Sequence, residues 1–179
     1  VRPVLLAFSF QYHATIATIT LTFSETIDVS SISTNALTLQ SVDELGIADS
    51  GSGAGSGVAP VQSYVLQGGV VSVHDDTVVT ITLTEVDVNE LKKLRFLGVS
   101  ASSTAIAFLD TTPFARDTAG NVVQPTTIVA TTFVADTEAP VLRSFSFNLT
   151  SEQLVLTFSE TVDASSFDAT QVYFQGAVC

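Results

Sequence analysis

Apolar and polar residues alternate along several stretches of the chain, which is the pattern of strands with one face in a protein core. Residues 4–10 and 19–23 place Val, Leu, Ile or Phe at every second position. Further apolar stretches follow at residues 37–39, 61–66, 70–73, 78–83, 105–109 and 127–134. Gly68-Gly69 and the acidic pair Asp75-Asp76 are turn signals between three of them. The pattern predicts an all-β, antiparallel sandwich.

One short helical insert is predicted at about residues 87–97. Asp87 and Glu90 have the spacing of a capping box, with Asp87 as the N-cap. Gly98 is expected to end the helix in the left-handed conformation. Three leucines at helical spacing form its apolar face, namely Leu91, Leu94 and Leu97. Residues 49–57, DSGSGAGSG, have the composition of an exposed flexible loop.

The chain contains an internal repeat. Residues 3–40 recur as residues 140–175, with two residues fewer between the first two strands, and the blocks FSF and LTFSET are identical in both copies. A repeat of this length predicts two copies of one folding unit. We therefore expect residues 1–138 to form a complete unit, and residues 139–179 to form the N-terminal part of a second one.

A sandwich that stops after its first strands leaves half of its core and its strand edges uncovered, which favours association. The second copy is therefore expected to be completed by a neighbouring subunit or by further chain. The residues predicted to make this assembly contact are Phe145, Phe147, Leu154, Leu156, Phe158 and Phe174. The linker DTEAP, at residues 136–140, is short and polar.

Composition excludes some partners. The chain has 18 acidic and 6 basic residues and a formal net charge of −12, which opposes nucleic-acid binding because that binding depends on Lys and Arg. No apolar run approaches the roughly 20 residues of a transmembrane helix, so membrane insertion is not expected.

The surface chemistry predicts an extracellular glycoprotein. Ser and Thr make up 44 of 179 residues, and Asn148-Leu149-Thr150 is an N-glycosylation sequon. Asn148 is the predicted N-linked site, and Ser and Thr residues are candidates for O-linked glycans. Because the chain begins at Val1 without a basic or apolar leader, we expect a mature protein or a piece of a longer one. Cys179 has no partner in the chain, so its thiol is either free or in an intermolecular disulfide.

Two short motifs carry a family resemblance. FSETID at residues 23–28 and DTAGN at residues 117–121 resemble the paired signatures of bacterial-type immunoglobulin-like domains of the S-layer and adhesin class. The resemblance covers residues 3–134 and recurs in FSETVD at residues 158–163. Members of the class are tandem modules of large secreted surface proteins. The resemblance therefore implies an immunoglobulin-like fold and a structural or adhesive role, and seven to nine short strands per unit suit that fold.

No enzymatic constellation stands out, and the chain is predicted not to be an enzyme. His13 and His74 have no Ser-His-Asp or HExxH spacing around them. No cofactor is predicted, except that carboxylates at the strand ends and in the linker are candidate Ca²⁺ ligands that would rigidify the joint between units. These candidates are Asp136, Glu138, Glu25, Asp28, Asp110 and Asp117. The alternative is that they are solvated surface acids.

Three functions fit these features. The favoured one is a structural module of a glycosylated extracellular filament or cell-surface coat, built by self-association of repeats and strand complementation. The second is an adhesin stalk or binding module for carbohydrate or protein, with Tyr12, Tyr64 and Phe114 as its aromatic candidates. The third is an accessory domain of a secreted hydrolase.

Overall fold

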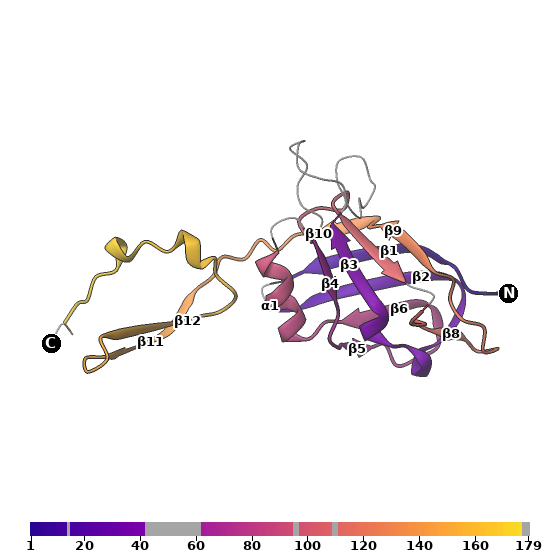
Figure 1. Cartoon of the computed structure of the whole chain (residues 1–179), viewed down its shortest axis with the longest axis horizontal. Coiled ribbons are helices and arrows are strands. Elements are labelled where there is room, and N and C mark those ends of the chain that lie inside the picture. Colours follow the sequence, from indigo (N-terminus) through magenta and orange to yellow (C-terminus); the bar gives the residue numbers. More distant parts are fainter. Residues whose placement is uncertain (14, 42–61, 95–96, 109–110, 177–179) are drawn as a thin grey trace. The chain divides into compact units, whose positions relative to one another are not determined.

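The structure, a computed structural model, describes residues 1–13, 15–41, 62–94, 97–108 and 111–176. It divides into two compact units, unit 1 from Val1 to Ala139 and unit 2 from Pro140 to Cys179. The described residues form mainly β-strands and a single α-helix (Figure 1), so the predicted all-β class is confirmed. The predicted Gly/Ser loop at residues 49–57, together with Arg95, Asp110 and Cys179, lies outside the described residues.

The first sheet of unit 1 contains the strands β1 (Leu5–Tyr12), β2 (Ala17–Asp28), β5 (Val70–Val71), β6 (Asp76–Thr82), β8 (Arg116–Asp117) and β10 (Thr132–Val134). Their order is β10-β1-β2-β6-β5, and β8 pairs with the end of β2. β1 and β10 run parallel, with Phe10 opposite Phe133. The prediction of a purely antiparallel sandwich was therefore wrong for this pair, which joins the first and last strands of the unit.

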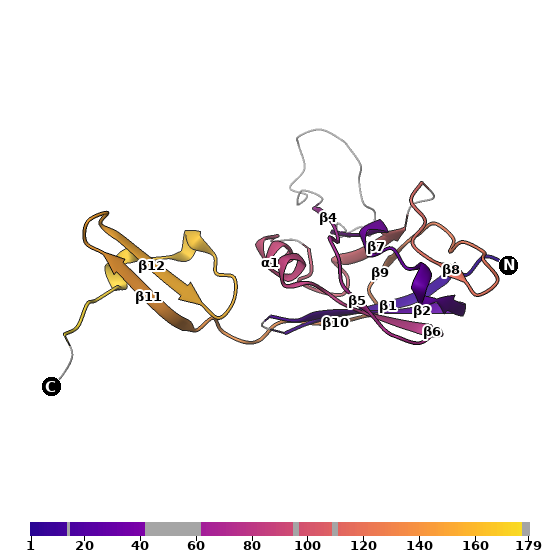
Figure 2. The same cartoon turned by 90° about the horizontal axis from the view of Figure 1, so that it is seen from below.

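The second sheet contains β3 (Leu37–Ser41), β4 (Ser63–Val65), β7 (Thr104–Phe108) and β9 (Thr126–Val129), in the order β4-β3-β7-β9. The predicted single stretch 127–134 is in fact two strands in two sheets. Ala130 N donates to Thr104 O of the second sheet at 2.8 Å, whereas Thr131 N donates to Phe8 O of the first at 2.8 Å. The chain thus crosses between sheets at this step, and Figure 2 shows the two sheets as separate layers.

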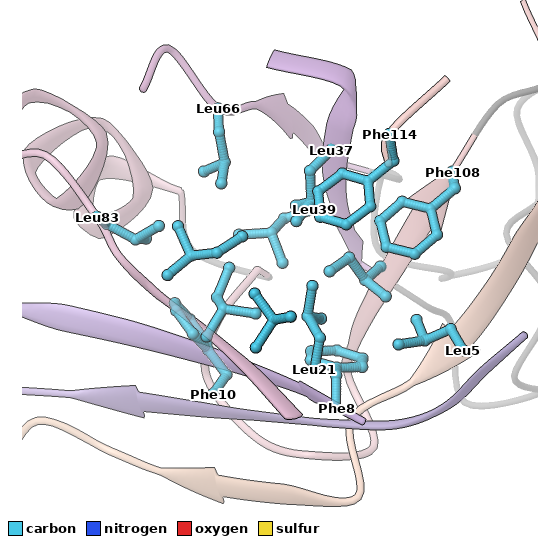
Figure 3. Packing of buried hydrophobic residues seen from close by; sticks show 14 of the residues in the cluster. Leu5, Phe8, Phe10, Leu21, Leu37, Leu39, Leu66, Leu83, Phe108 and Phe114 are labelled. Carbon is cyan, nitrogen blue, oxygen red and sulfur yellow. The ribbon is translucent and has the colours of Figure 1, made fainter. Parts of the chain in front are cut away.

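The core of unit 1 lies between the two sheets (Figure 3). On β2 the side chains of Ala17, Ile19, Leu21 and Phe23 are buried, while the threonines between them face outward. This is the alternation of a strand with one face in a core. The rings of Phe108 and Phe114 stack with their centroids 4.3 Å apart, so the loop before β8 also contributes to the core.

The helix α1 spans Glu85–Lys93, two residues earlier than its predicted start. Its N-cap is Thr84, not Asp87, because Thr84 Oγ1 accepts from Asp87 N at 3.1 Å. Asp87 lies in the first turn, where its fully buried carboxylate accepts from the hydroxyl of the N-cap residue, Thr84 Oγ1, at 2.7 Å. The C-cap is Leu94, so Gly98 does not end the helix as predicted.

Asp87 also anchors the helix to β4 and to the chain after it. Its Oδ1 accepts from the Tyr64 hydroxyl at 2.9 Å and from Gln67 N at 2.8 Å. A buried carboxylate is costly unless hydrogen bonds satisfy it, and these donors do so. Gly98, with φ of 69°, meets the Tyr12 ring so closely that a Cβ would lie 3.0 Å from Tyr12 Cε2.

Short 3₁₀ helices and one hairpin complete the described fold. Unit 1 contains η1 (Val29–Ser31) and η2 (Thr34–Ala36) between β2 and β3. Unit 2 contains the strands β11 (Leu142–Asn148) and β12 (Gln153–Phe158), followed by η3 (Ala164–Ser166) and η4 (Ala169–Gln171). Unit 2 therefore has the same order of elements as the first third of unit 1, up to the position of β3.

The Tyr64–Asp87 contact makes the stability of unit 1 fall as the pH rises into the alkaline range. Burial, followed by the hydrogen bond to Asp87, raises the pKa of Tyr64 to about 12, above its usual value of about 10. Its protonated form is thus favoured by folding, so this contribution is complete below about pH 10 and is lost as the pH rises towards 12. We expect Tyr64→Phe to lower the free energy of unfolding at pH 7 by about 1–3 kcal/mol.

Urea denaturation of both proteins at neutral and alkaline pH measures this effect, and the difference between them should shrink as Tyr64 ionises. Tyr173→Phe, at an exposed tyrosine of unit 2, is the matched control and should leave the urea midpoint unchanged. Equal stability of Tyr64→Phe and the parent at pH 7 would contradict the anchoring role of this contact.

Candidate assembly surface

The hairpin of unit 2 repeats the β1–β2 hairpin pair by pair. Both hairpins are antiparallel, and both shift register near the start of their first strand, at residues 5–7 and 142–144. The pairs that carry the apolar faces are Phe8–Leu21 and Phe10–Ile19 in unit 1, and Phe145–Leu156 and Phe147–Leu154 in unit 2. The two hairpins therefore place corresponding apolar side chains on the same face.

The polar contacts at the hairpin ends are repeated as well. Ser24 Oγ accepts from Val4 N at 3.0 Å, and Ser159 Oγ accepts from Val141 N at 2.9 Å. A second hydrogen bond, of 2.9 Å in each unit, caps the 3₁₀ helix that follows the hairpin. Ser30 N donates to Asp28 Oδ1 in unit 1, and Ser165 N donates to Asp163 Oδ1 in unit 2. The FSETID and FSETVD motifs thus fold alike through hydrogen bonds within the hairpin and within the turn that follows it.

The surroundings of the two apolar faces differ. In unit 1 the side chains of Phe8, Phe10 and Leu39 are at most 1% exposed. Their counterparts by sequence are Phe145, Phe147 and Phe174, which are 63%, 46% and 61% exposed. The other predicted assembly residues, Leu154, Leu156 and Phe158, are half-buried, whereas their counterparts Ile19, Leu21 and Phe23 are buried. All six predicted assembly residues therefore lie on or around one uncovered face.

This face, which we call the unit 2 apolar face, is hollowed. A cavity of about 330 Å³ is lined by Leu142, Phe145, Leu154, Leu156, Val172 and Phe174 together with Tyr173 and Gln175. The rings of Phe147 and Phe174 meet with centroids 5.1 Å apart. In the described part of unit 2 the sheet has two strands. An apolar face beside unpaired strand edges is a binding surface for another strand or layer.

The predicted glycosylation site lies at the tip of this hairpin. Asn148 ends β11, and its Oδ1 accepts from Thr150 N at 2.9 Å and from Ser151 N at 3.2 Å. Asn148, Leu149 and Thr150 are all exposed. A glycan on this side chain would therefore meet no buried surface of unit 2, and N-glycosylation stays a prediction compatible with the geometry.

Among the calcium candidates, Asp117 is used within its own loop. Its carboxylate accepts from Ala119 N, Asn121 N and Asn121 Nδ2 at 2.9, 2.7 and 2.8 Å. These bonds, that of the Asn121 side chain foremost, lower the pKa of Asp117. They also form an Asx-turn, which Gly120 completes with φ of 87°. The DTAGN motif thus closes a tight turn between β8 and the following strands.

The remaining candidates lie in separate contacts. Asp136 pairs with Lys92 of α1 at 2.5 Å and accepts from Glu138 N at 3.0 Å, whereas Asp28 caps η1 and Glu25 is half-buried in β2. Within the described ranges no three His, Cys, Asp or Glu side chains come together as a metal site. Calcium binding stays a prediction without a described cluster, and Asp110 lies outside the described residues.

The aromatic residues considered for a binding tip are placed elsewhere. Tyr12 and Phe114 are buried in unit 1, and Tyr64 donates to Asp87. Asp87 was predicted as an N-cap and not as an anchor between the helix and β4, although its spacing from Thr84 is that of a capping box and could have placed it in the first turn. No helix among the described residues has the length and hydrophobicity to cross a membrane.

Comparisons with protein-family models, curated proteins and solved structures find no match for this chain. The function of this chain is therefore inferred from its own residues.

The sequon makes a direct prediction. When the chain is secreted from a eukaryotic host, we expect an N-linked glycan on Asn148, because the acceptor and Thr150 are exposed together at the hairpin tip. Intact-mass spectrometry should show that Thr150→Ala loses the glycan mass. Thr150→Ser keeps the sequon and should retain it. A parent protein without a glycan, or a Thr150→Ala variant that keeps one at Asn148, would contradict the assignment.

Proposed function

We propose that the chain is a non-enzymatic structural module of a glycosylated extracellular filament or cell-surface coat. In this proposal unit 1 is a complete immunoglobulin-like repeat, and unit 2 is the N-terminal part of a second repeat. The repeats assemble by self-association, in which the unit 2 apolar face is covered by a neighbouring subunit. Support comes from the repeated motifs, the high Ser and Thr content and the exposed sequon.

The observation that carries the proposal is the difference in exposure between the two copies of one hairpin. The same pairing register and the same capping contacts occur twice. In unit 1 the apolar face is covered by the second sheet, and in unit 2 the corresponding side chains are exposed or half-buried. A sequence that places phenylalanines on such a face in both copies favours coverage in both.

Covering the unit 2 apolar face contributes to the free energy of association. Full burial of one large apolar side chain is worth about 1.5–3 kcal/mol. The three exposed phenylalanines are 46–63% exposed and their neighbours are half-buried, so covering all of them offers on the order of 5 kcal/mol by this measure. Association costs about 4–15 kcal/mol in lost freedom, so strand pairing must add to the contribution of the apolar face.

Removal of unit 2 tests this proposal. Deletion of residues 139–179 should give soluble monomers, because unit 1 keeps its own core, whereas the full chain should associate as its concentration rises. Sedimentation velocity measures the species present, and electron microscopy shows whether the associated material forms regular filaments.

A full-length variant provides the second arm. Phe145→Ser with Phe147→Ser should weaken association, because both side chains lie on the unit 2 apolar face. Val155→Ser, at a position that points to the other face of the same hairpin, should leave it intact. Polymerisation of the truncated chain, or a full chain that stays monomeric at high concentration, would contradict the proposal.

A further inference from the structure

In unit 1 the strand β6 covers the edge of β2 that corresponds to the edge of β12 in unit 2. β6 pairs antiparallel with β2, with Ile81 opposite Ile19 and Val79 opposite Leu21. Both β6 side chains are fully buried in the core. The threonines that alternate with them, Thr80 and Thr82, are on the outward face. The edge of the hairpin is thus paired by a strand that also contributes apolar side chains to the core.

The hydrogen-bond pattern fixes which backbone groups face this edge. Leu83 N donates to Ala17 O at 2.9 Å, and hydrogen-bonded pairs recur at every second residue of an antiparallel ladder. The backbone groups of Ile19 and Leu21 therefore point towards β6. Their counterparts on β12, Leu154 and Leu156, point to the edge that has no strand in the described part of unit 2.

We propose that this edge of β12 binds an extended strand of a separate polypeptide with the chemistry of β6. The strand runs antiparallel to β12, and its buried aliphatic residues lie opposite Leu154 and Leu156. These side chains cover the hollow beside Phe145 while threonines alternate on the outward face. The inference rests on the proposed function, in which a neighbour covers unit 2, and it names the chemistry and the register of the strand that pairs with β12.

An acidic residue just before the strand is part of the recognition. In unit 1 Asp75 Oδ1 accepts from Val29 N, the first residue of η1, at 3.0 Å. The counterpart of Val29 is Ala164, which begins η3 and is preceded by the N-cap Asp163, as Val29 is by Asp28. A partner strand in the β6 register brings its own carboxylate to Ala164 N. The expected partner segment is therefore an Asp followed by alternating β-branched aliphatic and Thr residues.

A synthetic peptide of residues 75–84, DDTVVTITLT, is the probe. Fluorescence anisotropy of the labelled peptide is measured against the full chain, at concentrations where sedimentation shows the chain to be monomeric. We expect saturable binding. A peptide N-methylated at Ile81 keeps every side chain but loses the N–H that faces β12, so it should bind about tenfold more weakly. An Asp75→Ala peptide should bind severalfold more weakly.

Chain variants locate the site. Leu156→Asp should abolish peptide binding. Because this variant leaves unit 1 unchanged, any binding that remains would be unrelated to unit 2. Val155→Ser, on the opposite face, should bind like the parent. Hydrogen exchange adds a readout that does not depend on variants, because bound peptide should protect the amides of Leu154 and Leu156. The amide of Val155, which already faces Ser146 of β11, should change little.

Four results would overturn the inference: no saturable binding, equal affinity of the N-methylated peptide, binding that survives Leu156→Asp, or exchange protection that omits Leu154 and Leu156. If two unit 2 faces pair with each other and exclude the peptide, the face belongs to a second copy and not to a β6-type strand. The filament proposal is tested separately. A chain that binds the peptide but never self-associates would support the strand-binding site and would contradict the role in filament assembly.

Discussion

An apolar face of a two-stranded sheet must be covered by another layer, and the structure of this chain depends on that constraint. A hairpin alone buries too little surface to be stable in water. In unit 1 the β1–β2 hairpin meets this requirement through β6 on its edge and the second sheet over its face. In unit 2 the corresponding hairpin carries corresponding apolar side chains with these elements absent from the described residues, and its Phe145 and Phe147 are exposed.

The polar interactions of unit 1 serve the same requirement. α1 lies between β6 and β7 in the chain, and its buried side chains Val88 and Leu91 belong to the core. Asp87 fastens the first turn of this helix to β4 through Tyr64 and Gln67. A buried carboxylate with three donors holds a fixed geometry, since any shift would leave its oxygens unsatisfied. The helix thereby becomes a firm part of the second layer.

The repeat separates interactions that are local from those that need partners. Capping by Asp28 and Asp163, the serine contacts to the preceding strand and the register shift are the same in both units. Residues 172–175 are the counterparts of Leu37–Gln40, yet they do not form a strand in unit 2. In unit 1 those residues are a strand because β4 and β7 pair with them on both sides. Strand structure there is a property of the sheet.

The sequence by itself determined the β-rich class, the repeat, the local turns and the residues of the uncovered face. Each follows from alternation, from identity between copies or from side chains that bond backbone groups a few residues away. The tertiary structure alone decided that β10 joins β1 in parallel and that the chain changes sheets at Ala130 and Thr131. These features depend on contacts between residues far apart in the chain. The alternation of apolar and polar residues along a strand does not show which other strand pairs with it. The resemblance in sequence between the units likewise leaves open what covers unit 2, because only the pairing of β6 with β2 in unit 1 shows what kind of strand lies along this edge.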